Sequence, residues 1–233
     1  MKSLQLLALD GTSAGSKSIE TIATLPELVQ LICPDGITNA DLAKLGALKK
    51  LGSLVASRSG ITDEGLNALK AMPALIGISF EYSKGITDKG AAVLAEIKTL
   101  TSVNLYATSV TVQGWRQLTM LPNLRAVGPG AIQPAEELHK VLAGIPTLTQ
   151  VIGTPGIDGS NLEFYKNHPA LAEIWFADPK LGDDRIPIVV TLKKLTRLNI
   201  KGSKITREGF EKLKAALPKC RIEWDGGVIE PKP

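Results

Sequence analysis

The sequence contains few of the side chains that acid–base, nucleophilic or metal chemistry needs, and they lie far apart along the chain. It has two histidines, His139 and His168, and two cysteines, Cys33 and Cys220. Nucleophilic catalysis requires a base beside the nucleophile, and a zinc site requires closely spaced ligands; the sequence indicates neither. We therefore expect no catalytic residue, no cofactor and no metal ligand, and we interpret both histidines as solvated or capping side chains.

Two loop segments contain residue types that serve chemistry in other settings. Glycines recur across residues 153–159, but the Gly-Lys-Ser/Thr ending of a phosphate-binding loop is missing. Asp183 and Asp184 could hold a cation weakly, although adjacent loop residues usually both face solvent. An enzyme with its site at these irregular segments is one of three functions that the sequence leaves open.

The elements that would position any site form an internal repeat. Gly60-Ile61-Thr62-Asp63-Glu64-Gly65-Leu66 returns at 85–91, and parts of it return at 37–42, 110–115 and 203–210. Prolines mark the junctions, at Pro26, Pro73, Pro122, Pro146, Pro169 and Pro218. Cutting there gives nine units of 23 to 26 residues, which begin at Lys2, Pro26, Lys49, Pro73, Thr99, Pro122, Pro146, Pro169 and Lys193. A fixed period of this length is typical of solenoid proteins.

Each unit predicts a short strand, a loop and a helix. Residues 103–105 alternate inward and outward as a strand does, threonine is a good cap for the helix that follows, and Leu66, Leu69 and Met72 share one helical face. Proline then ends the helix. One unit cannot bury its own apolar face, but stacked units can. Right-handed crossovers would make the sheet parallel, and the wider helices behind the strands would leave the sheet on the concave side.

The pattern Leu-x-x-Leu-x-Leu-x-x-Thr-x-Ile-Thr-Asp-Glu-Gly-Leu resembles leucine-rich repeats of the cysteine-containing and ribonuclease-inhibitor-like classes, including versions common in bacteria. The resemblance covers nearly the whole chain, and residues 213–224 look like the terminal turn of such proteins. It implies an α/β fold, a right-handed leucine-rich-repeat solenoid or horseshoe with a concave parallel β-sheet and convex helices. We expect one solenoid domain of about nine repeats with a C-terminal cap over residues 1–224, and a short flexible tail at 225–233.

Three units depart from the pattern. Gly128-Pro129-Gly130 interrupts the sixth, Thr154-Pro155-Gly156 the seventh and residues 183–187 the eighth. Glycine and proline disturb regular strands, so we expect local bulges and a weaker or missing helix in each of these units.

The strand register predicts which side chains lie on the concave face. Candidate partner-binding residues are Glu81, Asn104, Tyr106, Gln150, Glu173, Trp175, Arg197, Asn199 and Lys201. Tyr106 and Trp175 are large aromatics that repeat packing does not require, and interface hot spots are enriched in Tyr, Trp and Arg. The alternative is that Trp175 packs against its strand neighbours. Core positions are assigned to Phe80, Trp115, Phe176 and Phe210, and Trp224 is expected to cover the end of the core.

Positive charge is concentrated near the C-terminus. The net charge is +4, yet residues 193–221 contain ten Lys or Arg against two Glu. Terminal repeats need polar outer faces, which is one explanation. The other is attraction of an acidic protein or a polyanion, with Lys193, Lys194 and Lys204 joining Arg197 and Lys201.

The sequence therefore predicts a non-catalytic protein–protein interaction scaffold, a monomer, with an unknown protein ligand on its concave sheet. Polyanion or glycan binding through the basic C-terminal repeat is the alternative. We expect neither nucleic acid nor membrane as a partner, because a recognised nucleic-acid motif and a long apolar segment are both missing. No signal peptide is recognisable, and since the chain starts inside a repeat we expect a fragment of a larger or exported protein, so the compartment is not assigned.

Overall fold

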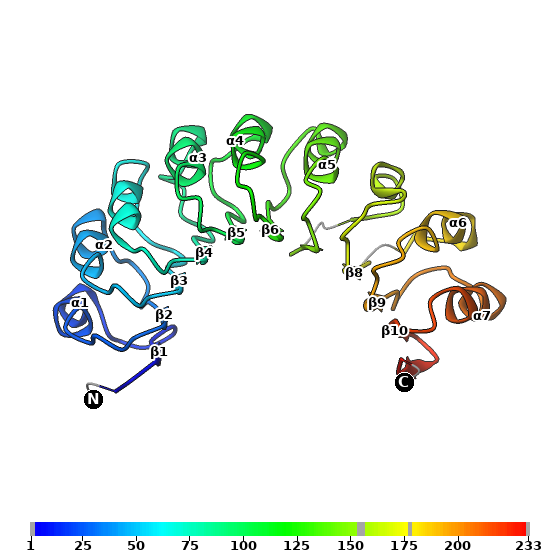
Figure 1. Ribbon diagram of the computed structural model, residues 1–233, viewed down its shortest axis with the longest axis horizontal. Helices are drawn as coiled ribbons and strands as arrows, with labels where there is room; N and C mark the ends of the chain where they lie inside the picture. Colours follow the sequence, from blue (N-terminus) through cyan, green and yellow to red (C-terminus); the bar gives the residue numbers. More distant parts are fainter. Residues whose placement is uncertain (1–2, 153–156, 177–178, 232–233) are drawn as a thin grey trace. The chain divides into compact units, whose positions relative to one another are not determined.

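The computed structural model describes residues 3–152, 157–176 and 179–231. The chain divides into two compact units, Met1–Pro129 and Gly130–Pro233. Within each unit, strands alternate with helices along the chain, and the strands lie on one side while the helices lie on the other (Figure 1). This is the expected α/β arrangement of parallel strands and covering helices.

The first unit has six strands that pair in chain order, all in parallel. Its elements are β1 (Leu6–Ala8), α1 (Ser16–Ile22), β2 (Gln30–Ile32), α2 (Asn39–Leu45), β3 (Ser53–Val55), the 3₁₀ helix η1 (Gly65–Ala71), β4 (Gly77–Ser79), α3 (Asp88–Ala95), β5 (Ser102–Asn104), α4 (Val112–Leu118) and β6 (Ala126–Gly128). Each of these strands has three residues, and the middle residue is buried in β2 to β6.

The second unit repeats this plan with shorter helices in its middle. Its elements are α5 (Ala135–Ala143), β7 (Gln150–Val151), η2 (Leu162–Tyr165), β8 (Glu173–Trp175), η3 (Asp183–Arg185), α6 (Ile186–Val189), β9 (Arg197–Asn199), α7 (Arg207–Ala216), β10 (Arg221–Trp224) and β11 (Gly227–Ile229). Strands β7 to β10 pair in parallel, and β11 pairs with β10 in antiparallel.

The C-terminal hairpin differs from the flexible tail expected at residues 225–233. Trp224 pairs with Gly227 and Ile222 with Ile229 in the β10–β11 ladder. Gly227 adopts φ +136°, a conformation that glycine reaches without a steric penalty. The sequence prediction missed this strand because the expectation rested on polarity and prolines, which say nothing of a local turn.

The core is built in aliphatic layers, as the low aromatic content of 4% indicated. Middle strand residues Leu31, Leu54, Ile78, Val103 and Val127 stack in register in the first unit and are all buried. The predicted core positions of Phe80, Trp115, Phe176 and Phe210 are confirmed. Trp224 stacks on Phe210 with ring centroids 4.2 Å apart, which agrees with its expected position at the end of the core.

The repeated Thr-Asp-x-Gly motif links consecutive repeats on the helix side. Asp63 accepts hydrogen bonds from the backbone N and the Oγ1 of Thr87, each at 2.7 Å. Asp88 binds Thr111 in the same way, also at 2.7 Å. A Cβ at Gly90 would collide with the Asp63 carboxylate, so glycine is needed where the carboxylate approaches. Asn39 performs the role toward Thr62 with its amide.

The irregular repeats follow the sequence expectation only in part. In the sixth repeat the expectation of a weak or missing helix is wrong, because α5 has nine residues. Pro134 precedes the helix, where its missing N–H costs nothing, and Glu136 and Glu137 suit the positive end of the helix dipole. In the seventh and eighth repeats the helices are short, as expected, with four residues in η2 and four in α6. Residues 154–156 lie outside the described residues.

Candidate functional site

The nine residues predicted to bind a partner divide between the two units. Glu81, Asn104 and Tyr106 lie in the first, and the other six lie in the second. All are at least partly accessible, and the middle residues of β4, β5, β8 and β9 (Ile78, Val103, Ile174 and Leu198) are buried, which agrees with the register that placed the candidate side chains outward. Their role in binding stays a prediction, and each unit presents its own group of side chains.

In the first unit, the three predicted residues form a connected group. Asn104 donates from Nδ2 to the Glu81 carboxylate over 2.6 Å, and its Oδ1 accepts from the backbone N of Tyr106 at 3.1 Å. The Tyr106 ring meets the edge of the Tyr82 ring, with centroids 5.5 Å apart. The guanidinium carbon of Arg58 lies 5.3 Å from the Tyr82 ring centre. We call this group, Arg58, Glu81, Tyr82, Asn104 and Tyr106, the tyrosine patch.

Sequence reasoning missed Tyr82 and Arg58, although a signal was present. Both stand four residues after the buried strand residue, where the first and ninth repeats have Gly11 and Gly202. All four residues have a left-handed backbone, with φ of +50° at Arg58 and +61° at Tyr82. A non-glycine side chain costs about 1 kcal/mol or more in that conformation. The fold therefore tolerates strain to hold a tyrosine ring that is 46% exposed.

In the second unit, Trp175 is the centre of a second group. It ends β8 and is 51% exposed, so the alternative that it packs against its strand neighbours holds for only part of the ring. The guanidinium carbon of Arg197 lies 5.3 Å from the ring centre, and Arg197 Nη1 lies 3.6 Å from the Glu173 carboxylate. Asn199 is the register partner of Trp175 on β9. We call Glu173, Trp175, Arg197, Asn199 and Lys201 the tryptophan patch.

Two further side chains border the tryptophan patch. Gln150 on β7 is the register partner of Glu173. Glu223 on β10 lies opposite Asn199 in the register and 3.5 Å from Lys201 Nζ. It also pairs with Arg221, which in turn reaches Glu230. The strand face of this unit is therefore a network of ion pairs around one exposed indole.

Both histidines are buried, so the expectation that they are solvated is wrong. His139 Nδ1 lies 2.8 Å from the Tyr165 hydroxyl. His168 Nε2 donates to the Ile145 carbonyl at 3.0 Å, and its Nδ1 accepts from the backbone N of Leu171, so His168 does cap local backbone groups. Burial lowers the pKa of His139 to about 4, against a smaller opposing effect of Asp158. Neutral, enclosed imidazoles have no access to an external substrate.

The two cysteines and Asp183 are also enclosed or engaged in hydrogen bonds. Cys33 and Cys220 are buried free thiols, and burial raises their pKa to about 12 and about 11. Asp183 is not a free carboxylate, because it binds the N and Oγ1 of Thr206, which lowers its pKa. Within the described residues, no three His, Cys, Asp or Glu side chains are grouped as metal ligands. None of the helices described is both long and apolar enough to cross a bilayer.

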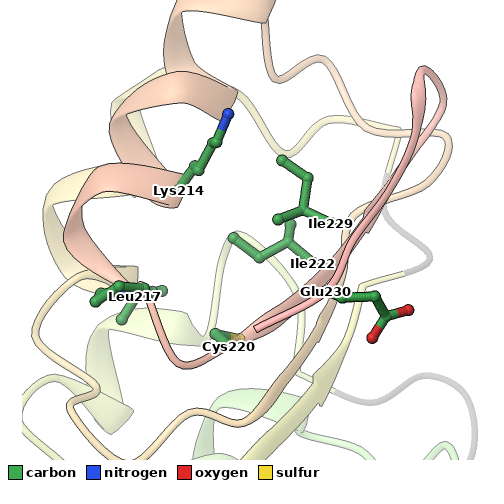
Figure 2. A pocket seen from close by; sticks show the side chains of 7 residues that line it. Lys214, Leu217, Cys220, Ile222, Ile229 and Glu230 are labelled. Carbon is green, nitrogen blue, oxygen red and sulfur yellow. The ribbon is translucent and has the colours of Figure 1, made fainter. Parts of the chain in front are cut away.

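Among the described residues of the second unit, two hollows bear on the question of a ligand site. One, of about 70 Å³, opens between α7 and the β10–β11 hairpin and is lined by Leu217, Cys220, Ile222 and Ile229, with Lys214 and Glu230 also at its wall (Figure 2). It is too small for a ligand larger than a few waters. The other, of about 350 Å³, lies at the irregular seventh and eighth repeats. There Asp158 already accepts hydrogen bonds from Ser160 and Asn161.

Comparison with known proteins defines the class of fold. The chain has the leucine-rich-repeat fold: it is similar to an internalin from Listeria monocytogenes, with a TM-score of 0.55 and 18% identity over 96% of this chain and 68% of that one. It is also similar to a leucine-rich-repeat protein of Leptospira interrogans, with a TM-score of 0.50 and 18% identity over 95% of this chain and 61% of that one. The expected resemblance to leucine-rich-repeat proteins is thus confirmed for the fold. No family model matches the sequence, and no curated protein matches it.

Proposed function

We propose that this chain is a non-catalytic recognition module that binds a protein partner through exposed side chains on its strand faces. Leucine-rich-repeat proteins are scaffolds whose stacked repeats offer extended binding surfaces. A fold does not by itself define a function, so the argument rests on the two patches. The observation that carries it is the exposure of Tyr82 and Trp175, large aromatics at positions where packing does not need them.

The tyrosine patch supports this proposal through its energetics. A left-handed Tyr82 is less favourable than the glycine found at the same position in other repeats. Strained non-glycine residues of this kind cluster at binding and active sites, and the side chain at Tyr82 is both large and exposed. Tyrosine is suited to that use, because it offers a large rigid surface and a hydroxyl with little loss of conformational entropy.

The test is affinity capture from a lysate of the source cells, with wild type and three variants compared. Tyr82→Ser with Tyr106→Ser removes the rings of the tyrosine patch, and Trp175→Ala removes the indole. Met120→Ala is the matched control, because Met120 is an exposed apolar side chain after α4, at 70% exposure. We expect a specific partner to be lost from at least one patch variant and kept by the control. Equal capture by all four proteins would refute a role for the strand faces.

Polyanion or glycan binding is a second candidate, favoured by the exposure of Lys193, Lys194 and Lys204 around β9. Binding of this kind releases counterions and weakens steeply with salt. Heparin titrations at rising salt test it. A steep salt slope that persists in Trp175→Ala would favour the basic end over the patches, and no heparin binding would remove this candidate.

A further inference from the structure

The tryptophan patch offers three features to a ligand: an open indole face, an arginine and a lysine. Trp175 is half exposed although Arg197 lies over its ring. Burying the rest of the indole against an apolar side chain would remove a large apolar area from water, which is favourable at about 25 cal/mol per Å². An aromatic or aliphatic group of the partner is therefore the expected neighbour of Trp175.

The cations of this patch are more accessible than the carboxylates in it and beside it. The side chains of Arg197 and Lys201 are 46% and 51% exposed, whereas those of Glu173 and Glu223 are 28% and 19% exposed. An approaching ligand therefore meets positive groups first. Carboxylates of the ligand would be attracted to Arg197 and Lys201, and ammonium groups of the ligand would be repelled by them.

Both cations keep hydrogen-bonding capacity for such a ligand. The distance of 3.6 Å from Arg197 to Glu173 exceeds that of a good hydrogen bond, as does 3.5 Å from Lys201 to Glu223. Guanidinium carries five N–H donors in a fork that matches a carboxylate. Glu223 is shared with Arg221, so it neutralises Lys201 incompletely. Exposed Lys193, Lys194 and Lys204 add positive charge before and after β9.

We propose that the tryptophan patch binds an acidic polypeptide segment that carries an aromatic or apolar side chain beside its carboxylates. The side chain would cover Trp175, and the carboxylates would bind Arg197 and Lys201. Glu173 and Glu223 favour a polypeptide over a dense polyanion, because closely spaced sulfates or phosphates would be repelled by them. This inference rests on the proposed function and names the chemistry of the partner.

The experiment is fluorescence anisotropy with two short fluorescein-labelled peptides, one alternating glutamate and phenylalanine, the other alternating lysine and phenylalanine. We expect wild type to bind the glutamate peptide and not the lysine peptide. Arg197→Glu and Lys201→Glu should each weaken binding about tenfold, the effect of losing roughly 1.4 kcal/mol. The double reversal should prefer the lysine peptide. Trp175→Ala should also weaken binding, and Trp175→Phe should recover part of the loss.

Arg207→Glu is the matched control, since it makes the same charge change on α7, among the helices, and at a helix start where glutamate is favourable. Far-UV circular dichroism confirms folding, and Arg197→Gln replaces the reversal if that variant does not fold. Equal binding of both peptides, or equal weakening by Arg207→Glu, overturns the proposal. So does Trp175-dependent binding of heparin without binding of the glutamate peptide. The two proposals can fail separately. If Trp175→Ala loses a partner in the affinity capture but wild type does not bind the glutamate peptide, an acidic ligand is refuted and the proposed function is retained.

Discussion

Single side chains connect one repeat to the next in this protein. The carboxylates of Asp63, Asp88 and Asp183 each bind the N and the Oγ1 of the threonine one repeat later. A buried or partly buried donor that loses its acceptor costs about 1 to 3 kcal/mol. The motif that makes the repeat recognisable in the sequence is therefore also a source of its stability.

Replacing Asp63 tests this role. Asp63→Ala leaves two donors of Thr87 without their acceptor, and we expect the free energy of unfolding to fall by about 2 kcal/mol. Asp63→Asn should cost less, because Asn39 performs the same role toward Thr62. Asp35→Ala, at an exposed loop carboxylate, is the control and should change little. Urea denaturation measures all three, and an Asp63→Ala midpoint equal to that of Asp35→Ala would contradict the proposed role.

The left-handed position four residues after each buried strand residue gives a second prediction. Ala107 occupies it with φ +56°, so Ala107→Gly should raise the free energy of unfolding by about 1 kcal/mol as strain is relieved. Ala43→Gly, in the middle of α2, should lower it by a similar amount. Chemical denaturation measures both variants, and changes of opposite sign in the free energy of unfolding would identify backbone strain at Ala107. A destabilising Ala107→Gly would show that the backbone carries none.

At the scale of elements, the sequence predicted strands better than helices. Three-residue strands follow from alternation, and threonine caps were correct at Thr38, Thr87, Thr111 and Thr206. In the sixth repeat Gly128-Pro129-Gly130 misled the prediction, because it lies at the end of the strand region and leaves α5 intact. The burial of His139 was missed since it depends on Tyr165, one repeat further along, which packs beside it. Tyr82 was also missed, although it aligns with Gly11 and Gly202 of other repeats, because that alignment becomes informative only when the position is known to be left-handed.

The buried histidine between α5 and η2 makes stability depend on pH. His139 has a pKa near 4 in the fold and an ordinary value near 6.5 when unfolded. Between these values the unfolded chain binds more protons, so the free energy of unfolding should fall as pH drops from about 6.5 toward 4, by about 3 kcal/mol at most. His168 shifts in the same direction. Urea denaturation from pH 7 to 4 measures the effect. His139→Gln should flatten the curve, and an unchanged slope would contradict this assignment.

At the scale of the whole molecule, the linking motif is unevenly distributed along the chain. The second repeat has a Thr-Asn pair, in which Asn39 acts, and the third and fourth have Thr-Asp pairs, in which Asp63 and Asp88 act. In the fifth repeat Val112 stands where an aspartate would, and in the sixth Pro134 stands where a threonine would. The two compact units meet in sequence at residues 129 and 130, within that interruption. Stability in a repeat protein is a sum of local and nearest-neighbour contributions, so it need not be uniform along this chain.

Amide hydrogen exchange should therefore vary from repeat to repeat within the second unit. The helices η2 and α6 have four residues each and no side-chain cap, so each offers few mutually supporting hydrogen bonds. Helix α7 has ten residues, a cap from Thr206 and the bond from Thr206 to Asp183. We expect the amides of 162–165 and of 186, 188 and 189 to exchange faster than those of 207–216, by about tenfold for each 1.4 kcal/mol of lost local stability. Exchange followed by mass spectrometry measures these segments in one sample, so α7 is an internal control. Equal protection across the three segments would mean that the second unit opens as one cooperative body, and local helix length would then not set its stability.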